Sequence, residues 1–337
     1  MDEIGITKEN MTKLKTPITI DHEMIDIDTS LTKLFSKKHT PKPEMLSITQ
    51  DYLKDNYPDI AQIYTDGSKN KDRVGSAYTC EIDNKHEHFR ITDNTSILTA
   101  ELTALDKALQ HAILDHQNEK VVIITDSLSS LDSCKDPDGS KTARPDIIET
   151  IYNRHDWLVK RNTKLTLLWA PSHINLKGNE IADSLANQGT KRNWVNEHTK
   201  LSPSEIGSLI KAHMRTKFQN IWDEYTKCKL FKSIYPSMKK TIDISTREQK
   251  LNRLRLNVPA FHLSRDKACE TCRKSLTPNH VLMNCIHFDG ERELVRTELE
   301  KSNLILSEEN ILHPDRKGLC KELILAFVEA INRMYYI

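Results

Sequence analysis

The sequence predicts an α/β protein in which a mixed sheet of five strands is flanked by helices. Three observations predict this fold. Short strand-like runs fill residues 60–91, leucines then recur at helical spacing over residues 96–116, and a β-branched run follows at Val121–Thr125. An apolar run without polar alternation is typical of a strand buried on both faces. Strands and helices therefore alternate along this part of the chain.

The first three strands are separated by turn residues and predict an antiparallel meander. They are Ile60–Thr65, Gly75–Ile82 and His86–Ile91. The helix that follows can be capped by Ser96 or by Asn94. After the strand at Val121–Thr125 we expect a helix from Ser127, a helix over residues 145–160, a strand at Leu165–Trp169 and a helix over residues 178–189 that ends at glycine.

The chain of 337 residues is long enough for two or three domains. We expect an irregular lead-in segment over residues 1–58, the α/β domain over residues 59–192, and a mainly helical region over residues 200–337. Total charge is balanced, with Lys+Arg 49 against Asp+Glu 48, and neither predicts nor excludes a polyanionic partner. Residues 200–267, however, hold 15 Lys/Arg against 6 Asp/Glu, which suits nucleic acid.

The N-terminus lacks a basic segment followed by an apolar one, and no apolar run approaches the roughly 18 residues of a membrane span. We therefore expect no membrane association. Three of the seven cysteines lie with a histidine near residue 275, which favours metal ligation over disulfides. This predicts an intracellular protein of the nucleus or cytoplasm, and the sequence gives no indication of a protein partner.

Four acids lie where a strand or helix could direct them to one point: Asp66, Glu101, Asp126 and Asp183. Clustered carboxylates repel one another and need a cation, and all-oxygen ligation selects Mg²⁺ or Mn²⁺ over zinc. Two such ions about 3.5 to 4 Å apart can bracket a phosphodiester. Asp66 is our candidate for the shared ligand because its strand is the most central. His173, in a loop ten residues before Asp183, is our candidate for proton shuttling or product release, because histidine side chains exchange protons near neutral pH.

Residues from about 60 to 190 resemble a type I ribonuclease H domain. The matching motifs are Thr65–Ser68, Ala100–Glu101, Thr125–Ser127, Pro171–His173 and Gly178–Asp183. In that family four acids bind two magnesium ions, a histidine assists turnover, and the enzyme cuts the RNA strand of an RNA/DNA hybrid. The resemblance implies these roles for Asp66, Glu101, Asp126, Asp183 and His173, and it implies a ribonuclease H-like fold.

The same resemblance assigns Ser68, Ser127 and Asn179 to nucleic-acid contact. Two features depart from the family pattern. Several members place amide side chains where this chain has Ile97–Leu98, so the RNA 2′-hydroxyls would be sensed by backbone groups or by neighbours such as Ser96 and Thr99. The stretch between Asp126 and Trp169 also offers no long basic protrusion, so binding of the substrate would need help from elsewhere.

A second motif, Cys269-x2-Cys272-x7-His280-x4-Cys285, predicts a closed structural zinc site. His287 is a poorer fourth ligand than His280 because it follows Cys285 too closely. Ahead of this motif, basic residues recur at intervals of two and three and would form one helix face: Arg247, Lys250, Arg253 and Arg255. Such a face could follow a phosphate backbone, or it could equally be an ordinary solvated surface.

Residues from about 247 to 288 are similar to the C-terminal segment of non-LTR retrotransposon polyproteins, in which a ribonuclease H domain precedes a cysteine-histidine module. The two resemblances imply a magnesium-dependent endoribonuclease that cleaves RNA/DNA hybrids and derives from a retrotransposon. The competing hypothesis is a non-catalytic nucleic-acid-binding protein domesticated from such an element. A magnesium titration with a labelled hybrid distinguishes the two.

Overall fold

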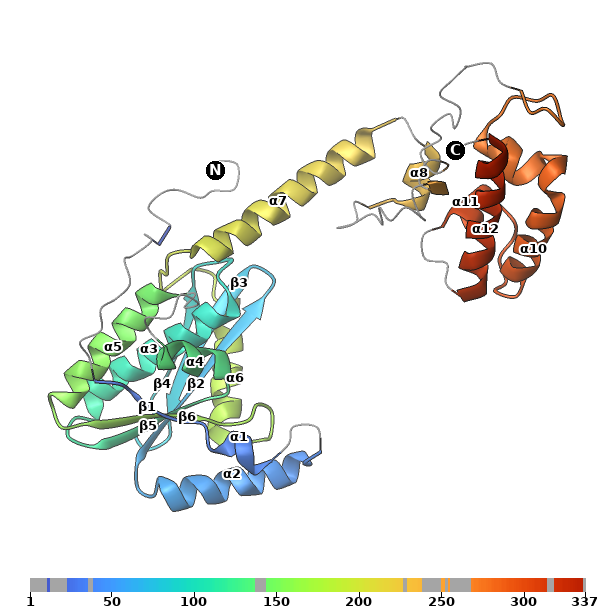
Figure 1. Ribbon diagram of the computed structural model, residues 1–337. Coiled ribbons are helices and arrows are strands. Elements are labelled where there is room, and N and C mark those ends of the chain that lie inside the picture. Colours follow the sequence, from blue (N-terminus) through green and yellow to red (C-terminus); the bar gives the residue numbers. More distant parts are fainter. Residues whose placement is uncertain are drawn as a thin grey trace. The chain divides into compact units, whose positions relative to one another are not determined.

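The computed structural model describes residues 11–12, 23–35, 39–136, 144–226, 229–237, 250–251, 254, 268–313 and 318–335. The chain divides into two compact units, which we call unit 1 (Met1–Lys211) and unit 2 (Ala212–Ile337). Figure 1 shows the elements of each unit. Within the described part of the chain, no helix has the length and apolar character needed to cross a bilayer.

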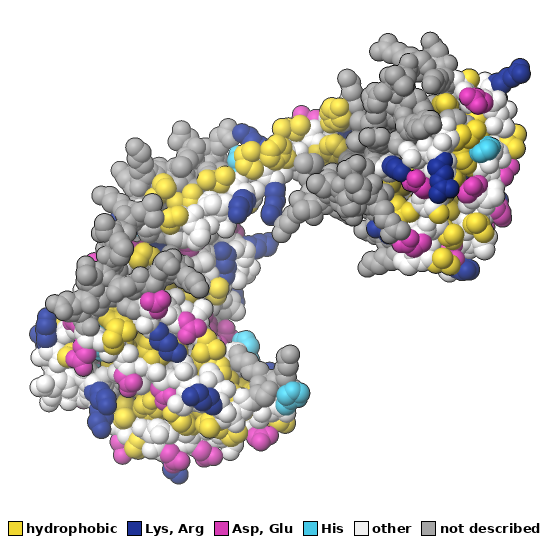
Figure 2. Space-filling view, in the orientation of Figure 1, with side chains coloured by type: hydrophobic (Ala, Val, Ile, Leu, Met, Phe, Trp, Pro, Cys, Tyr) yellow, Lys and Arg dark blue, Asp and Glu magenta, His cyan; other side chains and the backbone are white. Residues whose placement is uncertain are grey.

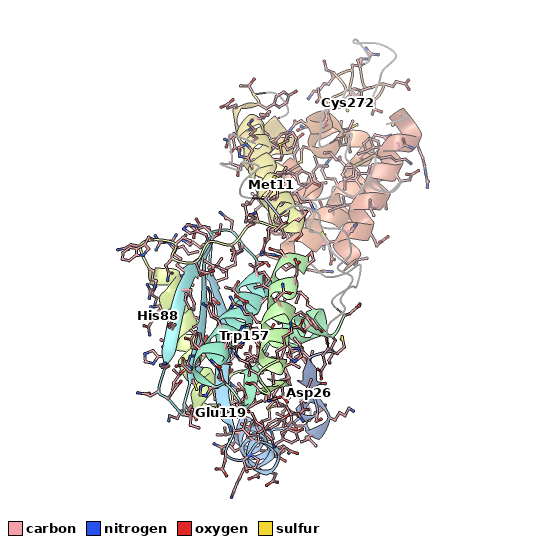
Figure 3. The ribbon with its side chains drawn as sticks, turned by 90° about the vertical axis from the view of Figure 1, so that its left-hand side faces the viewer. Met11, Asp26, His88, Glu119, Trp157 and Cys272 are labelled. Carbon is pink, nitrogen blue, oxygen red and sulfur yellow. The ribbon has the colours of Figure 1, made fainter. Side chains whose placement is uncertain are left out.

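Unit 1 is built on a six-stranded sheet with the order β1-β6-β5-β2-β3-β4. In chain order the strands are β1 (Asp26–Asp28), β2 (Ala61–Asn70), β3 (Arg73–Cys80), β4 (His86–Ile91), β5 (Lys120–Thr125) and β6 (Lys164–Trp169). The pairs among β2, β3 and β4 are antiparallel, as the meander predicts, and the other three pairs are parallel. Figure 3 labels His88 on one edge strand and Asp26 on the other.

The prediction of five strands is wrong by one, because the lead-in supplies β1. That strand spans three residues, too few to show an alternating pattern. Two helices follow it, α1 (Leu31–Leu34) and α2 (Lys42–Asn56). Residues 23–35 and 39–58 of the segment expected to be irregular are therefore part of the folded unit.

Packing and hydrogen bonds hold the lead-in in place. Leu31, Met45 and Leu53 are buried in the main core of unit 1. The Asp28 carboxylate accepts hydrogen bonds from the hydroxyls of Tyr52 at 2.6 Å and Tyr57 at 2.7 Å, which ties α2 to the edge strand. These contacts join residues about 25 apart, and no local pattern in the sequence reveals them.

Four helices cover the sheet: α3 (Ile97–Asp115), α4 (Leu128–Lys135), α5 (Pro145–Val159) and α6 (Lys177–Lys191). Gly75 of β3 faces α6, where an added Cβ would lie 2.1 Å from the Ala186 oxygen. The next residue, Ser76, donates a hydrogen bond to the Ala100 carbonyl in α3. Because successive strand residues point to opposite faces, α3 and α6 cover opposite sides of the sheet.

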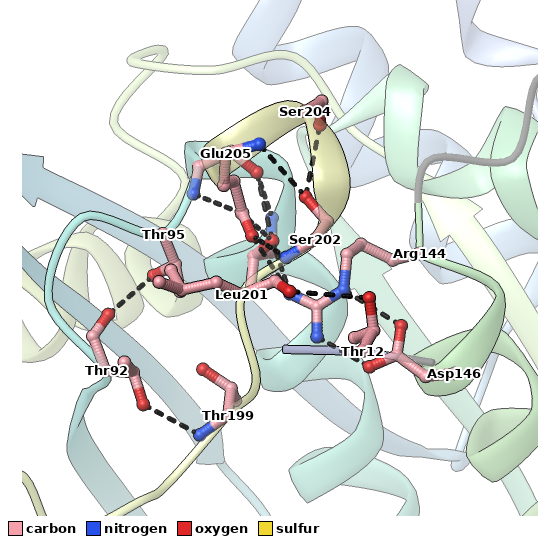
Figure 4. A network of polar contacts seen from close by, with 12 residues as sticks. Thr12, Thr92, Thr95, Arg144, Asp146, Thr199, Leu201, Ser202, Ser204 and Glu205 are labelled. Carbon is pink, nitrogen blue, oxygen red and sulfur yellow. Dashed lines mark hydrogen bonds and ion pairs between the residues drawn. The ribbon is translucent and has the colours of Figure 1, made fainter. Parts of the chain in front are cut away.

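The start of α7 (Pro203–Glu224) is bonded to unit 1 through Glu205 (Figure 4). This buried carboxylate accepts hydrogen bonds from the Ser96 backbone N–H and the Thr99 hydroxyl, both at 2.6 Å, and from the Ser202 backbone N–H at 2.7 Å. It also lies 3.7 Å from the Arg144 guanidinium at the start of α5. The N-terminal end of α3 is thereby fixed, and Ser96 rather than Asn94 caps it.

Further along, α7 exposes large apolar side chains, visible as the yellow stripe on this helix in Figure 2: Ile210, Met214, Phe218 and Ile221.

Unit 2 is mainly helical, as predicted. After α7, the described residues of unit 2 form α8 (Lys229–Ile234), the π-helical turn η3 (His280–Asn284), the 3-10 turn η4 (Ile286–Phe288), α10 (Asp289–Glu300), α11 (Glu308–Leu312) and α12 (Gly318–Tyr335). Phe288 and Phe327 meet in a core separate from that of unit 1.

Candidate metal-binding active site

Three of the four predicted acids meet at one end of the central strands. Asp66 lies on β2, between β3 and β5, and Asp126 directly follows β5. Glu101 comes from the first turns of α3. One carboxylate oxygen from each of the three lies within 4.8 Å of the others. Asp66 and Glu101 are each only 6% exposed, so this is a buried cluster of like charges.

Gly67 explains how Glu101 comes so close to Asp66. A Cβ at Gly67 would lie 2.7 Å from the Glu101 backbone nitrogen and 2.8 Å from the Ala100 Cβ, so any larger residue would push α3 away from β2. The Asp-Gly pair, which resembles an ordinary turn signal, is here a helix-to-strand contact that places two acids together.

The environment of the cluster favours protonation or a bound cation. Burial, followed by the charges of Asp126 and Asp183, raises the pKa of Asp66 to about 8. Burial and the neighbouring aspartates also raise the pKa of Glu101 well above its ordinary value. The Asp66 Oδ2 and Glu101 Oε2 atoms are buried and have no hydrogen-bond partner among the described residues. Unpartnered carboxylate oxygens of this kind are suitable ligands for a hard divalent cation.

The fourth acid, Asp183, belongs to an adjoining group on α6. Its ligand atom lies within 4.8 Å of those of His173 and Glu180. The charges of Asp183 and Glu180 both raise the pKa of Asp66, so the two groups face each other closely enough to interact. The four acids therefore form two neighbouring sets rather than one equidistant cluster, and the only two of them that are buried, Asp66 and Glu101, are in the same set.

Glu180 was not among the predicted site residues. Its position three residues before Asp183 places both on the same face of α6, and this spacing is the signal that the sequence offered. Its carboxylate also accepts a hydrogen bond from the Asn175 backbone N–H at 3.2 Å, which closes the loop between β6 and α6.

His173 is exposed in that same loop. Its φ of 53° and the φ of 66° at Asn175 are left-handed conformations that few non-glycine residues adopt. The loop is therefore tightly turned, and it presents the imidazole at the solvent side of the Asp183 group. Such a placement suits exchange of protons or product with solvent.

Asp126 and Ser127 are fixed by local contacts. The indole N–H of Trp169 on the neighbouring strand donates to the Asp126 carbonyl at 3.1 Å. The Ser127 hydroxyl accepts a hydrogen bond from the Ser130 backbone N–H and caps α4. The motif Thr125–Ser127 thus ends a strand, supplies an acid and starts a helix within three residues.

The residues predicted to contact nucleic acid have different surroundings. Ser68 is half-buried near the end of β2, whereas Asn179 is 3% exposed and its Oδ1 atom lacks a hydrogen-bond partner within the described chain. The expectation that Thr99 senses RNA is wrong, because this residue is fully buried and its hydroxyl donates to Glu205.

Of the predicted basic helix face, Lys250 pairs with Glu329 on α12. The other three predicted basic residues lie outside the described residues: Arg247, Arg253 and Arg255.

The cysteine-histidine motif of unit 2 does converge. The ligand atoms of Cys269, Cys272, His280 and Cys285 lie within 4.8 Å of one another, and His287 is not part of the group. The Sγ atoms of Cys269 and Cys285 are 3.6 Å apart, and those of Cys272 and Cys285 are 3.9 Å apart. Two thiolates on one tetrahedral zinc ion would be about 3.8 Å apart.

The surroundings of this cluster also fit a metal. The His280 Nε2 atom is buried and has no hydrogen-bond partner among the described residues. Burial raises the pKa of the Cys285 thiol to about 11, so a cation is needed to hold it as a thiolate near neutral pH. Arg292 of α10 donates hydrogen bonds to the backbone carbonyls of Leu282 and Cys285. These bonds fix the segment that carries the ligands His280 and Cys285.

One family model matches most of unit 1. Residues 58–191 match the family model described as RNase H, and all four acids lie within the matched segment. Among solved structures, the chain is similar to RNase H1 from the halophilic archaeon Halobacterium salinarum NRC-1, with 20% sequence identity and a TM-score of 0.31. The match covers 39% of this chain and 97% of that chain. Because residues 58–191 match the RNase H family model and form a mixed sheet covered by helices, unit 1 has an RNase H-like fold, and a helical C-terminal region follows it.

Proposed function

We propose that unit 1 is a magnesium-dependent endoribonuclease that cleaves the RNA strand of RNA/DNA hybrids. The observation that carries this proposal is the group of buried Asp66 and Glu101 with half-buried Asp126, with Asp183 beside it, inside a segment that matches the RNase H family model. A protein that needed only stability would not gather three carboxylates with two of them buried, because their charges oppose folding.

Each acid has a distinct place in the proposed reaction. Asp66 interacts with both groups and is the ligand that two ions would share. Glu101 and Asp126 would complete one site and Asp183 the other. Bound divalent ions, Mg²⁺ or Mn²⁺, would supply the positive charge that activates a water molecule and stabilises the leaving oxygen of the phosphodiester. His173, exposed beside Asp183, would exchange a proton with solvent as product leaves.

Substrate preference tests the proposal. The full chain is incubated with labelled RNA/DNA hybrid, double-stranded RNA and double-stranded DNA, each with magnesium and with a chelator. We expect cutting of the RNA strand of the hybrid alone, only with magnesium, leaving 3′-hydroxyl and 5′-phosphate ends. Cleavage of the DNA duplex instead of the hybrid would contradict the proposal.

The alternative function, binding without catalysis, is distinguished by the same experiment. It would give retention of the hybrid in a mobility-shift assay and no cleavage at any magnesium concentration. One of its expected contacts, Lys250, is paired with Glu329. The intact set of acids, with unpartnered buried oxygens on two of them, favours the catalytic function.

For unit 2 we propose a structural zinc ion held by Cys269, Cys272, His280 and Cys285. We also propose that the protein derives from a retrotransposon, because an RNase H-like unit is followed by this cysteine-histidine cluster. Because three of these ligands must stay reduced to bind zinc, we further propose that the protein acts in the nucleus or cytoplasm.

A further inference from the structure

A second mixed cluster lies in unit 1 and involves none of the active-site residues. Cys80 ends β3, Asp83 lies in the turn between β3 and β4, and His111 and His116 lie at the C-terminal end of α3. One ligand atom from each lies within 4.8 Å of the other three. His111 is ten residues from Glu101, or about 15 Å along the helix axis, so this cluster is separate from the acid site.

Two of the three ligand-to-ligand distances in the cluster match those around a tetrahedral metal ion, and the third is shorter. Zinc bonds of about 2.3 Å to sulfur and 2.0–2.1 Å to nitrogen or oxygen place a sulfur and a nitrogen ligand about 3.6 Å apart, and nitrogen and oxygen ligands about 3.3 Å apart. Cys80 Sγ lies 3.6 Å from His116 Nε2, and Asp83 Oδ2 lies 3.3 Å from the same nitrogen. His111 Nε2 lies 2.9 Å from Asp83 Oδ2.

Both imidazoles are oriented as metal ligands usually are. The His111 Nδ1 atom lies 3.0 Å from an Asp115 carboxylate oxygen, and the His116 Nδ1 atom lies 3.0 Å from a Glu119 carboxylate oxygen. Figure 3 labels Glu119. A carboxylate on one ring nitrogen holds the proton there and leaves the other nitrogen as a lone-pair donor. In both rings it is Nε2 that faces the cluster.

Without a cation, these inward-facing atoms oppose one another. His111 Nε2 and Asp83 Oδ2 are both buried, yet neither has a hydrogen-bond partner within the described chain, so their 2.9 Å approach lacks hydrogen-bond geometry. The His111 side chain is 98% buried, so water does not separate it from the Asp83 carboxylate. A bound metal ion resolves the conflict because it accepts both lone pairs.

The turn that carries Cys80 and Asp83 is built like a metal-binding knuckle. Two residues separate these side chains. The Lys85 backbone N–H donates to the other Asp83 oxygen at 3.0 Å, and the Cys80 N–H donates to the Lys85 carbonyl at 2.7 Å. The turn therefore holds a sulfur and an oxygen in fixed directions toward α3.

We propose that Cys80, Asp83, His111 and His116 bind a zinc ion that joins the β3–β4 turn to the C-terminal end of α3. One sulfur, two nitrogens and one oxygen suit zinc better than magnesium. The protein fills all four positions, so the site is closed and structural. Metal binding requires that Cys80 lose its proton, which goes to solvent, and each histidine binds as the neutral ring.

Zinc content of the full-length protein tests the proposal. We expect two zinc ions per chain by elemental analysis, one in this site and one in unit 2. Cys80→Ala and Asp83→Ala should each lose one ion, and Glu81→Ala, an exposed acid in the same turn, should lose none. Because the Asp83 side chain lies in a turn and is 22% exposed, we expect Asp83→Ala to fold. If Cys80→Ala does not fold, the zinc content of Asp83→Ala tests the site.

Cobalt substitution gives an independent readout. Unit 2 would offer three thiolates and this site one, so Cys80→Ala should remove about a quarter of the thiolate-to-cobalt absorption of the wild-type protein. An unchanged zinc content in folded Asp83→Ala, or an unchanged cobalt spectrum in folded Cys80→Ala, would overturn the proposal. Neither readout requires nuclease activity, so the outcome does not depend on the function proposed above.

Discussion

Two buried carboxylates of unit 1 show how surroundings decide the behaviour of one chemical group. Asp66 lies among other acids, and burial with their charges raises its pKa to about 8. Burial alone would also raise the pKa of Glu205, but hydrogen bonds from Thr99, Ser202 and Ser96, together with the charge of Arg144, lower it below its ordinary value. The first carboxylate needs a cation, whereas the second already has its partners.

Glu205→Gln tests the second environment. The amide N–H would face the Ser96, Thr99 and Ser202 groups, which are themselves donors, and the neutral side chain would no longer offset the charge of buried Arg144. We therefore expect a loss of about 1–3 kcal/mol in the free energy of unfolding near neutral pH. Urea unfolding measures it, with Glu44→Gln on the exposed face of α2 as the matched control.

The pH dependence of that loss follows from the sign of the shift. Because the folded-state pKa of Glu205 is depressed, its stabilisation is present above the unfolded-state pKa and disappears as the pH falls through the folded value. The difference between wild-type and Glu205→Gln proteins should therefore shrink below about pH 4.3, the ordinary pKa of glutamate. A difference that grows on acidification would contradict this account of Glu205.

Among the elements, those with a strong local period were predictable and those defined by distant contacts were not. The β-branched run of β5 and the leucine spacing of α3 were both confirmed. The edge strand β1 was missed because pairing with β6, not its own three residues, makes it a strand. The four acids were likewise predictable as a set, but their division into two groups depends on where α6 packs. The cluster around His111 could not be predicted, because it forms only when the β3–β4 turn meets the C-terminal end of α3.

The lead-in makes a testable contribution to stability. A fragment of residues 23–211 retains β1 and α2, whereas a fragment of residues 59–211 exposes the edge of β6 and the core surface that Leu31, Met45 and Leu53 cover. Loss of three buried apolar side chains costs about 1.5–3 kcal/mol each, so the shorter fragment should unfold at much lower temperature or aggregate. Equal melting temperatures by differential scanning calorimetry would show that the lead-in is dispensable.

The zinc ligands of unit 2 can be tested with two neighbouring histidines. His280→Ala removes a predicted ligand and should lower the zinc content by one ion per chain, with a loss of helical signal from unit 2. His287→Ala is the matched control and should keep its zinc, because His287 is exposed and outside the cluster. Loss of zinc in the control but not in His280→Ala would reverse the assignment.

For the whole molecule, the acid site predicts how magnesium and pH together set the stability of unit 1. The folded-state pKa of Asp66 is raised, so in metal-free protein its favourable contribution is complete below about pH 3.9, its unfolded value, and is lost as the pH rises through about 8. Magnesium neutralises the cluster and should offset this loss. Its stabilising effect is therefore expected to be larger above pH 8 than near pH 5.

Calorimetry with magnesium or chelator across this range measures the effect. At a hundredfold excess over Kd, we expect the melting temperature of unit 1 to rise by roughly 5–10 °C at high pH. Asp66→Asn should melt higher than wild type without metal and respond little to magnesium. A magnesium effect that is the same at every pH would contradict the assignment of Asp66 as a ligand.

The most direct test of the account is hybrid cleavage by Asp66→Asn beside Asp72→Asn, which carries the same substitution at an exposed position of the same hairpin. With magnesium, wild-type and Asp72→Asn proteins should cut the RNA strand at equal rates, and Asp66→Asn should be slower by more than about a hundredfold while still binding the hybrid. Equal cleavage by Asp66→Asn would show that the buried acids do not carry out the reaction.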